Sequence, residues 1–121
     1  LVFLGGGLGA ALRYGINVAV PRWLGDDFPW HTLLINISGC LVMGLISGAL
    51  AFRFNLPAEW RLFLLTGIFG GYTTFSAFTL DFALLMERGQ NPLALLYALA
   101  SVVGAVAACF AGLWLARTLL A

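Results

Sequence analysis

The chain has 121 residues, of which 62% are hydrophobic and only 9% are charged, and its mean hydropathy is +1.01. Soluble domains carry roughly a quarter charged residues, so this composition excludes a soluble globular protein and predicts one that lies in the lipid bilayer. The formal net charge of +1 and the lack of a basic run give no indication of nucleic-acid binding.

Charged residues are sparse enough to leave four apolar windows, each long enough for a bilayer-spanning helix of about 20 residues. We expect an all-α membrane protein with a single domain over residues 1–121 and four transmembrane helices, at 2–20, 30–52, 60–87 and 92–118. Turn-forming residues mark the connections, among them Pro21, Pro29, Pro57 and Pro92. Because one bundle of four helices can hardly enclose a pore, we also expect the chain to oligomerise.

The first expected span combines small residues with one charge. Gly5 and Gly9, four residues apart, favour close helix packing. Arg13 is charged at any physiological pH, so it either snorkels to the interface or lies in an aqueous vestibule. The sequence begins at Leu1 rather than at methionine, and we expect a few residues to precede it. Since no basic segment precedes the span, we expect no cleavable signal peptide.

The second expected span carries a primary amide, Asn36, several residues from its start. Hydrocarbon satisfies none of its donors and acceptors, so Asn36 must contact a partner helix or water. It either holds two helices together or offers an N–H donor to an anion path. His31, beside Trp30, is expected to be an interfacial residue. Cys40, like Cys109 in the fourth span, is expected to be a small core residue rather than part of a disulfide or metal site.

The third expected span contains the sequence GGYTTFSAF at residues 70–78, which predicts an interruption of the helix. Interrupted membrane helices persist where their freed backbone groups line a cavity, water or an ion. Two facing breaks would offer about four carbonyl oxygens, enough for Na⁺; the alternative is a close helix crossing without an ion. Phe75 and Phe78 share a face and either pack or present positive ring edges to a small anion. Asp81 is expected to have a structural role, by satisfying backbone donors or pairing with an arginine, rather than to carry protons.

The fourth expected span places Tyr97 and Ser101 on one face, at an i, i+4 spacing. The same face continues through Ala105 and Cys109, so the line of hydroxyls is short. The alternative for Ser101 is a hydrogen bond back to its own helix. Small residues at four-residue spacing also occur here and in the second span, and they favour close packing.

Six arginines and no lysine determine the expected orientation. The membrane side with both termini holds Arg53, Arg61 and Arg117, and the other side holds Arg22, Arg88 and, if it snorkels, Arg13. This near balance predicts insertion in both orientations and an antiparallel, inverted homodimer. The alternative is that residues preceding Leu1 restore a bias.

Three motifs resemble those of one membrane-protein family: GGLGAALRY at 6–14, TLLIN at 32–36 followed by Gly39 and Gly44, and GIFGGYTTFSAF at 67–78. By these motifs, and by the length and order of all four spans, the chain closely resembles the Fluc/CrcB fluoride channels. The third motif is highly specific.

The resemblance implies an inverted homodimer with two fluoride pathways and a structural Na⁺ at its centre, in the inner (plasma) membrane of a prokaryote. The backbone carbonyls of Gly70 and Thr73 would bind the Na⁺. The fluoride pathway would be lined by Asn36, Phe75, Phe78, Ser76, Thr79, Tyr97, Ser101 and Arg13. Three positions depart from the family's common residues: His31 for glycine, Asp81 for glutamate and Ala105 for a hydroxyl residue.

The expected function is therefore passive export of cytoplasmic fluoride down its electrochemical gradient, which confers fluoride resistance. Small multidrug resistance exporters have a similar length, four helices and dual topology, but they need a carboxylate in the first helix, where this chain has Arg13. A non-transporting membrane assembly subunit would need only the glycine-rich packing. No nucleophile and base pair and no cluster of metal ligands indicates an enzyme.

Overall fold

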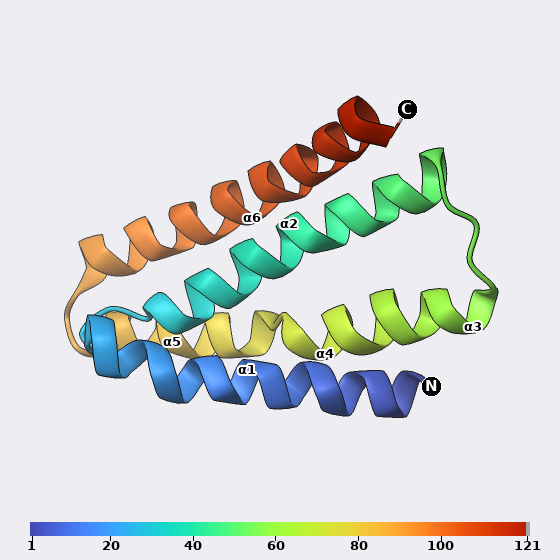
Figure 1. Cartoon of the computed structure of the whole chain (residues 1–121). Coiled ribbons are helices and arrows are strands. Elements are labelled where there is room, and N and C mark those ends of the chain that lie inside the picture. Colours follow the sequence, from blue (N-terminus) through green and yellow to red (C-terminus); the bar gives the residue numbers. More distant parts are fainter. Residues whose placement is uncertain (121) are drawn as a thin grey trace.

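The computed structural model describes residues 1–120 and contains only helices there. In chain order these are α1 (Val2–Leu24), α2 (Trp30–Phe52), α3 (Ala58–Arg61), the π-helix η1 (Leu62–Phe69), α4 (Gly70–Tyr72), α5 (Phe75–Glu87) and α6 (Asn91–Leu120). Because α3, η1 and α4 follow one another directly, they form one rod with α5, and the chain makes four passes (Figure 1).

Three segments are long and apolar enough to cross a bilayer: Trp30–Phe52, Ala58–Glu87 and Asn91–Leu120. They match the second, third and fourth expected spans. The first helix, α1, has 23 residues like α2, but Arg13, Asn17 and five glycines lower its hydropathy. Its crossing of the membrane stays a prediction.

The four passes form two pairs (Figure 1). The long helix α2 packs mainly on α6, and α1 packs mainly on η1 and α4. Both termini lie at the same end of the molecule as the connection 53–57, whereas the connections 25–29 and 88–90 lie at the other end. This placement is the one that four antiparallel passes require.

Glycines let the paired helices approach closely. A Cβ atom added at Gly5 of α1 would lie 2.5 Å from the carbonyl oxygen of Phe63 in η1. One added at Gly44 of α2 would meet the carbonyl oxygen of Cys109 in α6. The expectation that these small residues serve close packing is confirmed.

The first helix ends later than expected. Pro21 was expected in a connection, but it lies inside α1, which continues to Leu24. A proline removes only one amide donor, here the partner of the Asn17 carbonyl, and near a helix end water replaces that bond easily. The amide of Gly25 still donates to the carbonyl oxygen of Pro21 over 2.9 Å. The other helix bounds agree with the expected spans to within two residues.

Little of the chain is buried, and large apolar side chains lie on its surface. Phe3 is 87% exposed and Phe75 is 76% exposed. In water such a surface would drive association or aggregation. In a bilayer, acyl chains cover it, and a partner chain can cover the part that faces away from lipid.

Candidate functional site

The site is built around a break in the third pass of the chain, between α4 and α5. Thr73 and Thr74 have extended backbones, with φ −79° and ψ 155° for the first and φ −151° and ψ 125° for the second, and they separate α4 from α5. The interruption is where the 70–78 motif predicts it, but it lies at the threonines, whereas Gly70 and Gly71 are helical. β-Branched residues accept an extended backbone readily. Gly71 serves packing instead, since a Cβ there would lie 2.5 Å from the carbonyl oxygen of Gly6.

Asn36 of α2 holds the break at two points. Its Nδ2 donates to the carbonyl oxygen of Thr74 over 3.0 Å, and the Thr74 amide donates to its Oδ1 over 2.8 Å. The side-chain amide thus replaces the helical acceptor that the Thr74 amide has lost and adds a second bond at the Thr74 carbonyl. One of the two expected roles, that of joining two helices, is therefore present. One N–H of Asn36 remains after these two bonds, and its part in an anion path stays a prediction.

The break also frees the carbonyl oxygens of residues 70–73 from their helical donors, and those of Gly70 and Thr73 are two of these four. In a continuous helix the Thr74 amide would donate to Gly70 and the Ala77 amide to Thr73. Here the Thr74 amide donates to Asn36, and the Ala77 amide donates to Oγ1 of Thr74 over 3.1 Å, which caps α5. The carbonyls of Gly70 and Thr73 have therefore lost their helical donors. This is the backbone chemistry that a cation site made of carbonyl oxygens requires, so both residues fit the predicted Na⁺ ligands.

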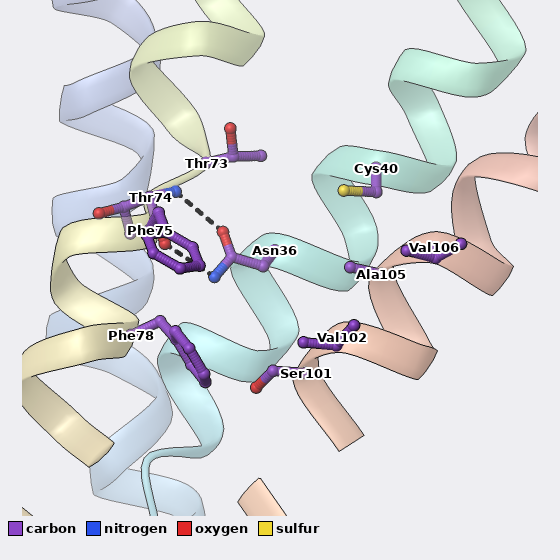
Figure 2. A pocket seen from close by; sticks show the side chains of 10 residues that line it. All are labelled: Asn36, Cys40, Thr73, Thr74, Phe75, Phe78, Ser101, Val102, Ala105 and Val106. Carbon is purple, nitrogen blue, oxygen red and sulfur yellow. Dashed lines mark hydrogen bonds between the residues drawn. The ribbon is translucent and has the colours of Figure 1, made fainter. Parts of the chain in front are cut away.

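A cavity of about 340 Å³ lies beside the break, between α2, α5 and α6 (Figure 2). It brings together five of the predicted site residues: Asn36, Thr73, Phe75, Phe78 and Ser101. The other five do not line it: Gly70, Ser76, Thr79, Tyr97 and Arg13. The remaining lining residues are Cys40, Thr74, Val102, Ala105 and Val106. Most of the wall is thus apolar, with a few polar groups among it.

The two phenylalanines lie next to each other at the cavity (Figure 2). The ring centroids of Phe75 and Phe78 are 5.5 Å apart and their planes are inclined by 44°. Phe78 also contacts the ring of Tyr97, at 5.1 Å between centroids, which fixes it against α6. A tilted ring can turn its positive edge toward an anion. The two rings thus lie together at the cavity wall, while their contact with fluoride stays a prediction.

Ser101 is the unsatisfied hydroxyl of the cavity. Its side chain is only 7% exposed, and its Oγ has no hydrogen-bond partner among residues 1–120. The alternative that Ser101 bonds back to its own helix is therefore wrong. By contrast, Thr79 Oγ1 donates to the carbonyl oxygen of Phe75 over 3.0 Å, and Ser76 Oγ lies 3.3 Å from Thr74 Oγ1. Those two hydroxyls are already occupied within their own segment.

The carboxylate of Asp81 on α5 joins this helix to α2 and α6, outside the lining of the cavity. Asp81 Oδ2 accepts hydrogen bonds from Thr32 Oγ1 over 2.7 Å and from the Tyr97 hydroxyl over 3.2 Å. Asp81 thus has the structural contacts expected of it, but its partners are these two hydroxyls rather than backbone donors or an arginine. Tyr97 is fully buried in this network. Thr32 was missed, although its position four residues before Asn36 places it on the same helix face.

The two remaining predicted polar residues lie away from the cavity. Arg13 is half-buried on α1 and does not line it, so the choice between snorkelling and a vestibule stays open. His31 is also half-buried and lines a second, smaller cavity of about 140 Å³ at the end of the molecule. Charged residues surround it there, namely Asp26, Asp27, Asp81 and Arg88.

Comparison with known proteins gives one consistent result. Residues 1–113 match the family described as CrcB-like protein, Camphor Resistance (CrcB). The chain is 60% identical over 119 residues to Fluoride-specific ion channel FluC 2 of Nitrobacter hamburgensis, which covers 98% of this chain and 96% of that protein. Fluoride-specific ion channel FluC of Rhodopseudomonas palustris gives the same identity and coverage. The protein of that name from Chelativorans sp. is 52% identical over 120 residues, or 99% of this chain and 96% of its own length. The chain therefore belongs to the CrcB family.

Proposed function

We propose that this protein is a fluoride-selective channel that exports cytoplasmic fluoride passively and so confers fluoride resistance. The observation that carries the proposal is identity: relatives named as fluoride-specific ion channels match almost the whole chain at 50–60%. The break in the third pass and the cavity beside it support the proposal, because they lie in the motif that the sequence marks as most specific.

The cavity offers replacements for the hydration shell that fluoride loses. An amide N–H of Asn36 and the hydroxyl of Ser101 can donate to the ion, and the ring edges of Phe75 and Phe78 add positive potential at a largely apolar wall. Acid carries fluoride into the cell as neutral HF, which ionises in the cytoplasm, and the ion then leaves down its gradient. Transport of this kind needs no coupling carboxylate, and α1 has no acidic residue, which speaks against the proton-coupled exporter.

The assembly we propose is an antiparallel homodimer of chains with four membrane passes, in the inner membrane of a prokaryote. Three observations support it. The arginines are nearly balanced between the two ends, the termini share one end of the bundle, and the cavity-lining ring of Phe75 is 76% exposed on the single chain. A second copy packed against this face would cover that ring and enclose the path.

Sodium is the cofactor we propose for the centre of this dimer. The carbonyls of Gly70 and Thr73 would hold it, since their helical donors are engaged elsewhere. The ion would supply positive charge that holds two facing breaks together. Purified protein transferred from sodium to N-methyl-D-glucamine buffer should dissociate or lose activity, and added Na⁺ should restore it. A dimer that is equally stable and active without Na⁺ would remove the ion from the proposal.

Reconstitution tests the function directly. Purified protein is placed in liposomes loaded with potassium fluoride. Valinomycin lets K⁺ leave together with fluoride, so that no membrane potential builds up against efflux, and a fluoride electrode records the fluoride released. Fluoride efflux well above that of protein-free vesicles is expected, with little chloride efflux under the same conditions. Efflux no faster than in empty vesicles would refute the channel, and equal chloride efflux would refute its selectivity.

A further inference from the structure

Cys40 lies at the cavity rather than in a dry helix contact. It follows Asn36 by one helical turn on α2, so both side chains point to the same side of that helix. Both line the cavity of about 340 Å³, and Figure 2 shows the Cys40 sulfur above the Asn36 amide, across from Ala105 on α6. The thiol is free and half-buried, which leaves part of it open to a molecule in the cavity.

A second, independent observation indicates that this cavity takes up water or an ion. Ser101 Oγ lines the same cavity, is more than nine-tenths buried, and has no hydrogen-bond partner in the chain between residues 1 and 120. A buried hydroxyl without a partner is unfavourable, so water or an ion is expected beside it. The thiol of Cys40 therefore faces a space that small polar molecules enter.

The rest of the lining makes Cys40 the reactive group of this space. The neighbouring positions are hydrocarbon or amide: Val102, Ala105 and Val106 on α6, and Asn36 on α2. The second cysteine, Cys109, is also free and half-buried on α6, but it does not line the cavity. Cys109 is thus a control thiol, which is half-buried like Cys40 but lies outside the cavity lining.

From this geometry we infer that Cys40 is a thiol-modification site in the ion path, which small neutral electrophiles reach through the cavity and whose modification obstructs fluoride. The inference rests on the proposed function for its effect on transport. With methyl methanethiosulfonate, the Cys40 sulfur attacks the thiomethyl sulfur of the reagent. A new S–S bond forms, the reagent's own S–S bond breaks, methanesulfinate leaves with the electron pair, and the thiol proton goes to water. The added thiomethyl group then occupies part of the cavity.

The experiment treats reconstituted wild-type protein, Cys40→Ser and Cys109→Ala with methyl methanethiosulfonate at mildly alkaline pH, where more of the thiol is ionised. Peptide mass spectrometry reads which cysteine carries the thiomethyl group, and the fluoride electrode reads efflux before and after treatment. Wild type and Cys109→Ala should be modified at Cys40 and lose at least half of their efflux. Cys40→Ser should keep its efflux, and dithiothreitol should restore that of the other two.

Two outcomes overturn the inference, and a third tests the proposed function separately. If Cys40 stays unmodified in the folded protein but reacts after denaturation, the thiol is not open to the cavity. If Cys40 is modified and efflux is unchanged, the cavity is not the path. If untreated wild type passes no fluoride, the proposed function fails instead, and the mass measurement still decides whether Cys40 is accessible.

Discussion

Replacement of Asn36 by alanine tests how the break is held. Both hydrogen bonds of the side-chain amide end on the backbone of one residue, Thr74, at 2.8 and 3.0 Å. The substitution removes both at once and leaves the Thr74 N–H without a partner, while the Thr74 carbonyl keeps only the bond that it accepts as the N-cap of α5. Thr74 is only 9% exposed, so water replaces these bonds poorly. The extended segment should lose its anchor to α2, and the chain should be less stable as well as less conductive.

The size of the effect follows from the two bonds. Interhelical hydrogen bonds in membrane proteins average about 0.6 kcal/mol and reach about 1.7 kcal/mol. Two of them therefore contribute about 1.2–3.4 kcal/mol, which is about a 7- to 270-fold change in the unfolding equilibrium.

Unfolding in mixed micelles of a mild detergent and dodecyl sulfate measures the stability of each variant, and the rate of fluoride efflux from liposomes measures its conduction. Asn36→Asp is the matched control: it keeps an oxygen that accepts from the Thr74 amide, loses the Nδ2 donor, and adds a negative charge to the cavity. It keeps one of the two bonds but places a charge at a largely apolar wall, so it should cost at least as much stability as Asn36→Ala and suppress fluoride efflux at least as strongly. An Asn36→Ala chain that unfolds at the wild-type midpoint would refute the anchoring role, and an Asn36→Asp chain with wild-type efflux would refute the role in the path.

Three further substitutions test other parts of the structure. Gly71→Ala should destabilise the fold by about 1–3 kcal/mol, because its Cβ would lie 2.5 Å from a carbonyl oxygen of α1. Gly70→Ala is the control, since a Cβ at Gly70 would meet nothing closer than 3.8 Å, and equal unfolding midpoints for the two variants in micelles would contradict this reasoning. Tyr97→Phe should lower the free energy of unfolding by about 1 kcal/mol, because it removes one of the two hydroxyl donors to Asp81. Asp81→Leu should lower it more, because both donors then lose their acceptor, and the reverse order in the same assay would contradict this. Phe75→Ile should lower fluoride efflux several-fold with little change in stability, because the ring is 76% exposed on the single chain, and unchanged efflux would remove this ring from the path.

Much of the fold follows from simple features of the sequence. Apolar windows bounded by arginines and prolines predicted the helices at 30–52, 60–87 and 92–118 to within two residues, because hydrocarbon thickness fixes the length of a span. The break was predicted from the 70–78 motif, but its position was not. Glycine weakens a helix by about 1 kcal/mol, and the packing of Gly71 on α1 outweighs that local preference. The two threonines, which gain a cap and an anchor by leaving the helix, take the extended backbone instead.

The pairings inside the site were beyond sequence periodicity. Asn36 and Thr74 are separated by 38 residues, and Thr32 and Asp81 by 49, and the amphipathic pattern of a helix says only which side chains share a face. The sharing of a helix face does, however, connect Cys40 with Asn36. Cys40 stands one turn after Asn36, so a cavity at the amide places the thiol in it as well. A residue taken alone as a small core side chain is thus part of the site when it is considered together with its helix face.

The polar groups at the break divide into two sets, and the division bears on the dimer that we propose. The N–H and C=O of Thr74 find their partner within the chain, in Asn36, and the amide of Ala77 finds the Thr74 hydroxyl. The carbonyls of Gly70 and Thr73 receive nothing from those donors, although each free carbonyl in hydrocarbon costs several kcal/mol. One chain therefore fixes the shape of the break but leaves its acceptors open. On the proposed function, a cation shared with the break of an inverted partner satisfies them, so the same nine residues that shape the fluoride path also require the dimer that encloses it.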